Sequence, residues 1–182
     1  MTLSGFPIQR DDEPTAPVVT ASSLLPPGGT DQDRARARLL AGALAPGVGD
    51  YKVVVIPGSP HAKERPRAGE GRVHKSARDK DAEARTGWLL RPAFRKPWAG
   101  NLAIGAVFFR PTRQHVDTDN LLKHVCDAGN GIAWFDDAQI TGQYGVLELD
   151  AVHPRTLLVV TRHVSSMDRS DIVKARPVRR SR

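Results

Sequence analysis

Five aspartates and one lysine lie within twenty-one residues of the chain: Asp117, Asp119, Lys123, Asp127, Asp136 and Asp137. Like charges about 4 Å apart repel by roughly 4 kcal/mol at an effective dielectric constant near 20, so aspartates that converge in a fold usually need a cation between them. Oxygen ligands suit Mg²⁺, with Mn²⁺ as a substitute, and such an ion activates a bound water and neutralises phosphate. The stretch therefore predicts a magnesium site suited to phosphodiester hydrolysis.

The first two aspartates flank Thr118, just before a predicted helix. In an extended segment, residues two apart project to the same side, so Asp117 and Asp119 are expected to present their carboxylates together. Thr118 or Asp119 is also a candidate N-cap, because either side chain can accept a hydrogen bond from a free backbone N–H. Capping the helix would need only one of the two acids, so the presence of both favours a pair of metal ligands.

The helix that follows is expected to run from Thr118 or Asp119 to Gly129, where glycine suits the end of a helix. Its apolar stripe consists of Leu121, Leu122, Val125 and Ala128. Asn120, Lys123 and Asp127 fall on another face. Lys123 stands one turn beyond Asp119, where it could contact a phosphate or form a salt bridge with Asp119 or Asp127. Spacing leaves these alternatives open.

Asp136 and Asp137 follow the apolar residues 132–135, which we predict to be a short strand. In an extended backbone neighbouring side chains point to opposite faces. We therefore expect one member of the pair to be a metal ligand and the other to have a structural role. Trp134 is expected to pack in the core beneath them.

A second group of charged residues is basic and lies mainly in a loop rich in Gly and Pro. Arg and Lys side chains position a DNA backbone without reading its sequence, although a merely solvated loop is the alternative. The candidate DNA contacts are Lys63, Arg65, Arg67, Arg72, Lys75, Arg110 and Arg113.

The charge of the whole chain agrees with a polyanionic partner. Residues 1–50 hold four of the 27 Lys and Arg and six of the 20 Asp and Glu, which leaves residues 51–182 at +9. Such an excess attracts nucleic acid or an anionic membrane surface. The sequence contains neither a long apolar run nor a signal-peptide pattern, and its single cysteine, Cys126, excludes an internal disulfide. We expect a soluble, cytoplasmic protein with Cys126 buried on a helix.

The spacing of apolar residues, together with the positions of Pro and Gly, predicts the helices and strands that position these residues. The predicted strands are residues 51–56, 101–110, 132–135, 139–149 and 155–163. The predicted helices are residues 75–90 and 118–129, with a short, loosely docked helix at 31–44. The expected core-facing positions of the first helix are Ala77, Ala82, Ala84, Trp88 and Leu89.

This order predicts an α/β (α+β) fold with one domain at residues 51–163, in which a mixed β-sheet is flanked by two main helices. Residues 1–50, rich in Pro and Gly at their start, are expected to be a disordered or loosely docked extension. Residues 164–182 are expected to be a mobile basic tail.

The spacing Asp117-x-Asp119-Asn120-x2-Lys123-x3-Asp127-Ala128-x-Asn130-Gly131, followed by Asp136-Asp137-x-Gln139-Ile140, resembles the signature of RusA-like Holliday junction resolvases. The resemblance covers residues 51–163 and includes Pro57-Gly58 and the Lys63-x-Arg65-Pro66-Arg67 loop. It implies a homodimeric, magnesium-dependent endonuclease that nicks four-way DNA junctions symmetrically.

The resemblance also implies roles for individual residues. Asp117, Asp119 and Asp137 match the acidic metal-site residues, and Lys123 matches a lysine important for cleavage. The matching supporting residues are Asn120, Asp127 and Asp136. Gly129 departs from the larger apolar residue of many relatives, which predicts a helix that ends earlier or packs less tightly. The competing hypotheses are a non-catalytic DNA-binding protein and a metal-dependent hydrolase of other branched DNA, RNA or small nucleotides.

Overall fold

The computed structural model describes residues 30–63 and 75–174 and contains a four-stranded sheet in the order β1-β4-β2-β3. Strand β4 is antiparallel to both β1 and β2, whereas β2 and β3 are parallel, so the predicted mixed sheet is confirmed. The strands are β1 (Tyr51–Pro57), β2 (Leu102–Arg110), β3 (Ile140–Leu149) and β4 (Arg155–Arg162). The helices are α1 (Asp31–Leu44), α2 (Ala77–Leu90), α3 (Thr118–Gly129) and the short 3-10 helix η1 (Asp137–Gln139).

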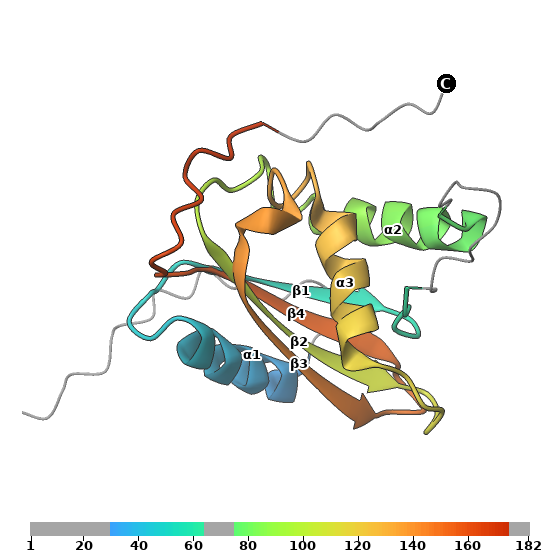
Figure 1. Ribbon diagram of the computed structural model, residues 1–182. Helices are drawn as coiled ribbons and strands as arrows, with labels where there is room; N and C mark the ends of the chain where they lie inside the picture. The colour runs from blue at the N-terminus through green and yellow to red at the C-terminus, as the bar shows by residue number, and fades with distance from the viewer. Residues whose placement is uncertain (1–29, 64–74, 175–182) are drawn as a thin grey trace, which may run out of the picture.

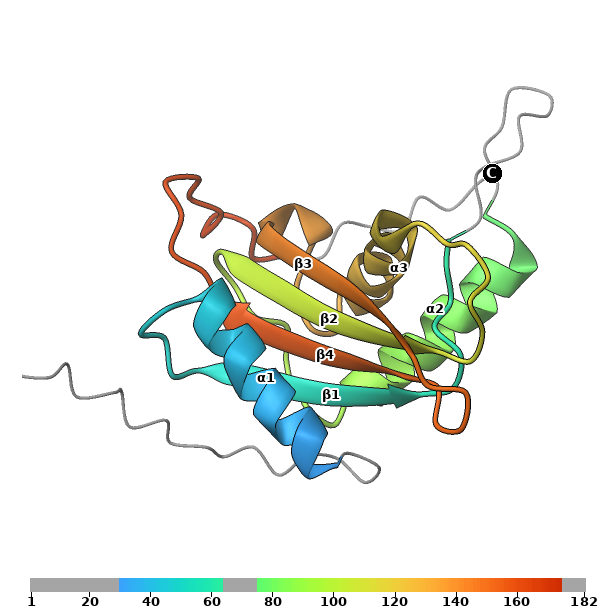
Figure 2. The same cartoon turned by 90° about the horizontal axis from the view of Figure 1, so that it is seen from below.

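Helices cover both faces of the sheet. Figure 1 shows α2 and α3 on one face and α1 on the other, and Figure 2 shows α1 lying across the strands. The two central strands, β2 and β4, are buried along nearly their whole length, in keeping with the apolar runs at their centres. The predicted α+β class is confirmed, and the short helix expected at residues 31–44 is present as α1 beside the two main helices. The predicted disorder of residues 1–29 falls outside the described residues.

The face under α2 and α3 holds the larger core. Trp134 is fully buried there, and its indole Nε1 donates a hydrogen bond to the Cys126 carbonyl oxygen at 3.1 Å. A Cβ atom at Gly129 would lie 2.1 Å from the Trp134 ring, so only glycine allows this contact. Helix α3 continues through Gly129, and the prediction of an earlier end or looser packing is wrong because the ring occupies the missing side chain's place.

The predicted strand at residues 132–135 is also wrong. These residues form a turn after α3, in which the N–H groups of Ile132 and Ala133 donate to the Gly129 carbonyl oxygen. Trp134 makes isolated bridges to Trp98 and Asn130 and no longer ladder within the described chain. A short apolar segment can pack as a turn when one large ring, here that of Trp134, accounts for most of its buried surface. The spacing of apolar residues does not distinguish such a turn from a strand.

The buried face of α2 differs from the prediction. Ala77 and Ala84 are exposed and Trp88 is 68% exposed, whereas Ala82 and Leu89 are half-buried. The buried positions are Asp79, Thr86, Gly87 and Leu90. A Cβ atom at Gly87 would lie 2.6 Å from the Ile132 side chain and 3.0 Å from the Ala128 carbonyl oxygen. The two helices therefore approach closely on a small and polar face, which an apolar pattern does not reveal.

Helix α1 is joined to the sheet by both packing and charge. Its buried residues meet a second core formed by alternate residues of β2 and β4, including Phe109 and Leu157. The buried Asp33 carboxylate accepts two hydrogen bonds from Arg155, from Nε at 3.1 Å and from Nη2 at 2.9 Å. The Arg155 guanidinium also lies 3.7 Å from the centre of the Phe109 ring. The helix expected to be loosely docked is thus held by a buried, bidentate ion pair.

Candidate active site

An open cleft beside α3 brings three of the predicted site residues together. Asp119 and Lys123 line it from α3 and Asp137 from η1, in a space of about 390 Å³. The lining is completed by Cys126, Ala138 and Gln143. Asp119 and Lys123 stand one helical turn apart, so their shared face follows from sequence spacing. Asp137 reaches the same cleft through the turn after α3.

The turn that carries Asp137 is held by its neighbours. Asp136 is the N-cap of η1, and its Oδ1 accepts a hydrogen bond from the Ala138 N–H at 2.9 Å. The fully buried Gln139 side chain accepts from the N–H groups of Phe135 and Asp136. Its Nε2 donates at 2.9 Å to the carbonyl oxygens of both Trp98 and Gly100. The buried Asp136 therefore caps the turn, while Asp137 lines the cleft.

Asp117 occupies a different position from Asp119. It is the exposed N-cap of α3, and its carboxylate accepts a hydrogen bond from Asn120 Nδ2 at 3.2 Å. The prediction that Thr118 or Asp119 is the N-cap is wrong, because the helix already includes both residues. Among the described residues, Asp119 lines the cleft and Asp117 does not. Its role as a metal ligand stays a prediction.

Lys123 is available to the cleft. It forms no ion pair with the residues that the structure describes, so the two alternative salt bridges, to Asp119 and to Asp127, are not made. Asp127 instead pairs with Lys63, which also lies 3.8 Å from Glu83. The ammonium group of Lys123 can therefore meet an anion that enters the cleft.

Lys63 and Lys75 belong to a charge cluster with Glu83 of α2 and Asp127 of α3. Lys75 Nζ lies 2.8 Å from Glu83 and 3.9 Å from Asp127, while the Lys63 N–H donates to the Asn120 carbonyl oxygen at 3.3 Å. Burial, together with the charge of Lys75, lowers the pKa of Lys63. Both lysines are paired within the protein, and their contact with DNA stays a prediction.

The other predicted DNA contacts lie in two places. Arg110 ends β2 and donates from Nη1 to the Gln114 carbonyl oxygen at 3.1 Å, and Arg113 is exposed in the loop before α3. Arg65, Arg67 and Arg72 lie outside the described residues. The structure therefore places these two arginines in the segment that leads from β2 to α3, and their contact with DNA stays a prediction.

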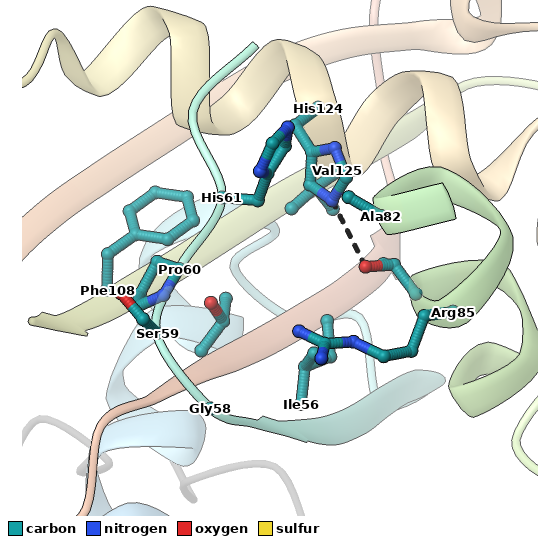
Figure 3. A pocket seen from close by; sticks show the side chains of 12 residues that line it. Ile56, Gly58, Ser59, Pro60, His61, Ala82, Arg85, Phe108, His124 and Val125 are labelled. Atoms are coloured by element: carbon teal, nitrogen blue, oxygen red, sulfur yellow. Dashed lines mark hydrogen bonds between the residues drawn. The ribbon is translucent and has the colours of Figure 1, made fainter. Parts of the chain in front are cut away.

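Sequence analysis missed the contact between the buried His124 of α3 and the half-buried His61, which Figure 3 shows beside a small pocket. His61 Nε2 lies 2.8 Å from Asp79 Oδ1, and His124 Nε2 lies 3.1 Å from Thr86 Oγ1. The two imidazole rings meet edge to face, 4.8 Å apart. Burial, with the charge of His61, lowers the pKa of His124 to about 4. No spacing signal could have found these contacts, because their members are far apart in the chain.

Cys126 lies at the base of the cleft and is buried, as predicted. Burial and the nearby Asp137 charge raise the pKa of its thiol to about 12. The thiolate is the nucleophilic form of cysteine, so Cys126 stays protonated and inert near neutral pH.

The donor set of the cleft fits a hard divalent cation. No group of three His, Cys, Asp or Glu side chains converges among residues 30–63 and 75–174. Magnesium, however, commonly takes one or two carboxylates, several waters and a substrate phosphate. Asp119 and Asp137 supply the two carboxylates, and the amide of Gln143 lines the same space.

A family model described as Endodeoxyribonuclease RusA matches residues 57–160. The chain belongs to this family. The matched region includes β2, α3, η1 and β3, so every residue of the cleft lies inside it. The resemblance predicted from the sequence is confirmed, and the family consists of endodeoxyribonucleases that act on branched DNA junctions.

Two further findings accompany the family match. No curated protein matches the chain at a significant level. None of the described helices is both long and apolar enough to cross a membrane. RusA family membership therefore carries the functional assignment.

Proposed function

We propose that this RusA family member is a magnesium-dependent endonuclease that resolves four-way DNA junctions during recombination and repair. One observation supports this most: two carboxylates and a lysine with no ion pair among the described residues line a single open cleft within the matched region. Two acids beside a cation are what a metal and a phosphodiester together require. A non-catalytic DNA-binding protein has no use for such a combination.

The residues of the cleft take complementary roles in this proposal. Asp119 and Asp137 hold Mg²⁺, with Asp117 at the start of α3 as the third acidic residue. When bound, the ion activates a water and neutralises charge on the phosphate. Lys123 donates hydrogen bonds to phosphate oxygens as negative charge develops on them. Asp136 keeps the turn of Asp137 in place, and Asn120 orients Asp117 through its amide.

Junction resolution needs two cuts in strands of like polarity. A homodimer with two-fold symmetry presents two equivalent clefts to the two strands. The expected product is a pair of nicked duplexes, formed by paired hydrolysis. The excess of +9 on residues 51–182 favours association with the junction's phosphates.

Cleavage of a labelled four-way junction tests the proposal. Purified protein should nick the junction with Mg²⁺ or Mn²⁺ and not with a chelator. Asp119→Asn should abolish cleavage while retaining junction binding, because the amide cannot replace the charge of a metal ligand. Asp81→Asn removes the same charge from the exposed surface of α2 and should cleave like the parent protein.

Two results would contradict the proposal. Cleavage that survives Asp119→Asn would exclude the metal site, and binding without any metal-dependent cleavage would favour the non-catalytic alternative. Parallel assays with a three-way junction, a linear duplex and an RNA hairpin measure selectivity. Equal turnover of all four would assign a general nuclease in place of a junction resolvase.

A further inference from the structure

The chain between α2 and β2 carries cations and no acid. Residues 84–116 contain neither Asp nor Glu. Arg91, Arg95 and Lys96 are exposed there, and none of them forms an ion pair with a residue that the structure describes. Exposed cations without acids among them create a positive local potential, which attracts polyanions.

Trp98 brings two further cations to this segment. The guanidinium carbon of Arg162 lies 4.5 Å from the centre of the Trp98 ring, and Lys52 Nζ lies 5.9 Å from it. Phe94 meets the same ring edge to face at 5.4 Å. Lys52 belongs to β1 and Arg162 to β4, so segments far apart in the sequence converge on one ring. The surface here called the Trp98 patch consists of Lys52, Arg95, Lys96, Trp98 and Arg162.

The Arg162 side chain is held in a position to bind an anion. Its Nη1 donates to the Ala99 carbonyl oxygen, and its Nε lies 3.8 Å from the exposed carboxylate of Asp50. The side chain is nevertheless 42% exposed. A guanidinium has five N–H donors in one plane, and a ring stacked on that plane leaves its edge uncovered. Arg162 is therefore preorganised, which lowers the entropic cost of binding a phosphate.

The Trp98 patch lies on the same face of the sheet as α3. Val54 and Val160 pack in the core under α2 and α3. Lys52 and Arg162 are two residues away from them in the same strands, so their side chains project to that face. Trp98 packs against the edge of this core. The patch and the acidic cleft therefore face the same side of the protein.

Hydrogen bonds connect the Trp98 patch to the turn that carries Asp137. The Trp98 N–H donates to the Ala133 carbonyl oxygen at 2.9 Å, and Gln139 Nε2 donates to the Trp98 carbonyl oxygen at 2.9 Å. Gln139 is the last residue of η1, which begins at Asp137. Figure 1 shows the segment between α2 and β2 beside η1. A DNA molecule held by the patch is thus held next to the cleft.

We propose that the Trp98 patch is a second DNA-contact surface, which binds the phosphates of a duplex arm while the cleft holds the strand to be cut. The inference rests on the proposed function and adds contacts that the sequence analysis did not assign. Duplex DNA carries one negative charge per about 1.7 Å of its axis, so a fixed set of cations on one face meets several phosphates at once. Lys63 and Lys75, by contrast, are paired with Glu83 and Asp127.

Binding of a labelled four-way junction by Asp119→Asn protein, measured against salt concentration, isolates the patch from cleavage. Arg95→Gln with Lys96→Gln should reduce the slope of log affinity against log salt by about 2, since each phosphate contact contributes about 0.9. Affinity at about 0.1 M salt should fall at least about tenfold by the same relation. Adding Lys52→Gln should reduce the slope by about 1 more.

The matched control removes two charges from the opposite face of the sheet. Arg34→Gln with Arg38→Gln changes exposed positions of α1 and should alter neither the slope nor the affinity. A linear duplex with the sequence of one arm should show the same dependence on Arg95 and Lys96, because the patch contacts duplex DNA and not the branch point. Thermal unfolding of each variant verifies that the fold is retained.

Cross-linking locates the patch on the DNA. Cys126 is the only cysteine of the chain, it is buried, and the pKa of its thiol is raised to about 12. A photoreactive group can therefore be attached selectively to a new cysteine. Protein labelled at Lys96→Cys should cross-link to the duplex arms, whereas protein labelled at Arg38→Cys should not. Cross-links confined to the branch point would overturn the assignment to an arm.

The outcomes separate the patch from the proposed function. If the parent protein binds and cleaves junctions while the patch variants behave like the α1 control, the patch is wrong and the function stands. Patch-dependent junction binding without metal-dependent cleavage would support the patch and overturn the endonuclease. Patch-dependent binding to phosphatidylserine vesicles, with DNA binding unchanged in the variants, would assign the surface to a membrane and overturn the proposal. A parent protein that binds no DNA overturns both.

Discussion

The two faces of the sheet use aspartate and a basic residue in opposite ways. Under α1, Asp33 and Arg155 are buried and joined by two hydrogen bonds, and Arg155 also donates to Asp150. Beside α3, Asp119, Asp137 and Lys123 line an open cleft, and Lys123 has no ion pair within the described residues. The same chemical groups thus stabilise the fold where they are buried together and line an open cleft where they are not.

The largest expected effect is on cleavage. Asp137→Asn should lower the rate of junction cleavage at least about a thousandfold, equivalent to about 4 kcal/mol, because the amide supplies no charge to the metal. The free energy of unfolding should change by less than about 1 kcal/mol, because Asp137 is only partly buried where it lines the open cleft. Single-turnover cleavage and thermal unfolding measure the two quantities. A large loss of stability would show that Asp137 resembles Asp33 after all.

The complementary experiment removes the buried ion pair between Asp33 and Arg155. Asp33→Asn leaves the Arg155 guanidinium buried without its main counter-charge, and we expect a loss of about 3 kcal/mol in the free energy of unfolding. Cleavage by the folded protein should stay near that of the parent, because α1 lies on the opposite face from the cleft. Chemical denaturation gives the stability, and assays well below the unfolding temperature give the rate. A thousandfold loss of rate would contradict the division between the faces.

Acid should affect the fold through His124. Its pKa is about 4 in the protein against 6.5 for the free side chain, so the unfolded chain binds more protons between these values. The free energy of unfolding is therefore expected to fall as pH decreases from 6.5 to 4, by up to about 3 kcal/mol. His124→Gln should flatten this dependence, whereas His153→Gln, at an exposed loop position, should not.

The smallest expected effect concerns the partly buried charge cluster of Lys63, Lys75, Glu83 and Asp127. The Lys75 side chain is 44% exposed and the Lys63 side chain 15%, and both face Glu83 and Asp127. Lys75→Gln should cost less than about 1 kcal/mol of stability, because exposed ion pairs contribute little. Lys63→Gln should cost more, since it leaves Asp127 with less compensation. Equal losses in the free energy of unfolding for the two variants, measured by denaturation, would show that burial does not distinguish the two lysines.

Local patterns predicted much of this molecule. The β-branched runs became β1, β2 and β4, and the apolar stripe of residues 118–129 became the buried face of α3. The shared position of Asp119 and Lys123 follows from helical spacing alone. Asp137 could be assigned over Asp136 from the family resemblance, and the cap made by Asp136 supplies the physical reason for their difference.

The missed features depend on contacts between distant residues. Asp33 and Arg155 are 122 positions apart, and no local pattern pairs them. The polar face of α2 is explained by His61, which reaches Asp79 from another segment, and by the glycine contact of Gly87 with α3. Gln143 lines the cleft because of the register in which β3 pairs with β2. The sequence alone does not predict that register.

The parallel pairing of β2 and β3 has a consequence for how activity arises during folding. Parallel neighbours need a long crossover, and here it runs from residue 111 to residue 139 and carries Asp119, Lys123 and Asp137. The cleft is incomplete until β3, which carries Gln143, docks against β2. Recovery of junction cleavage after refolding should therefore require the β2-β3 ladder, which makes enzymatic activity a reporter of the assembly of that ladder.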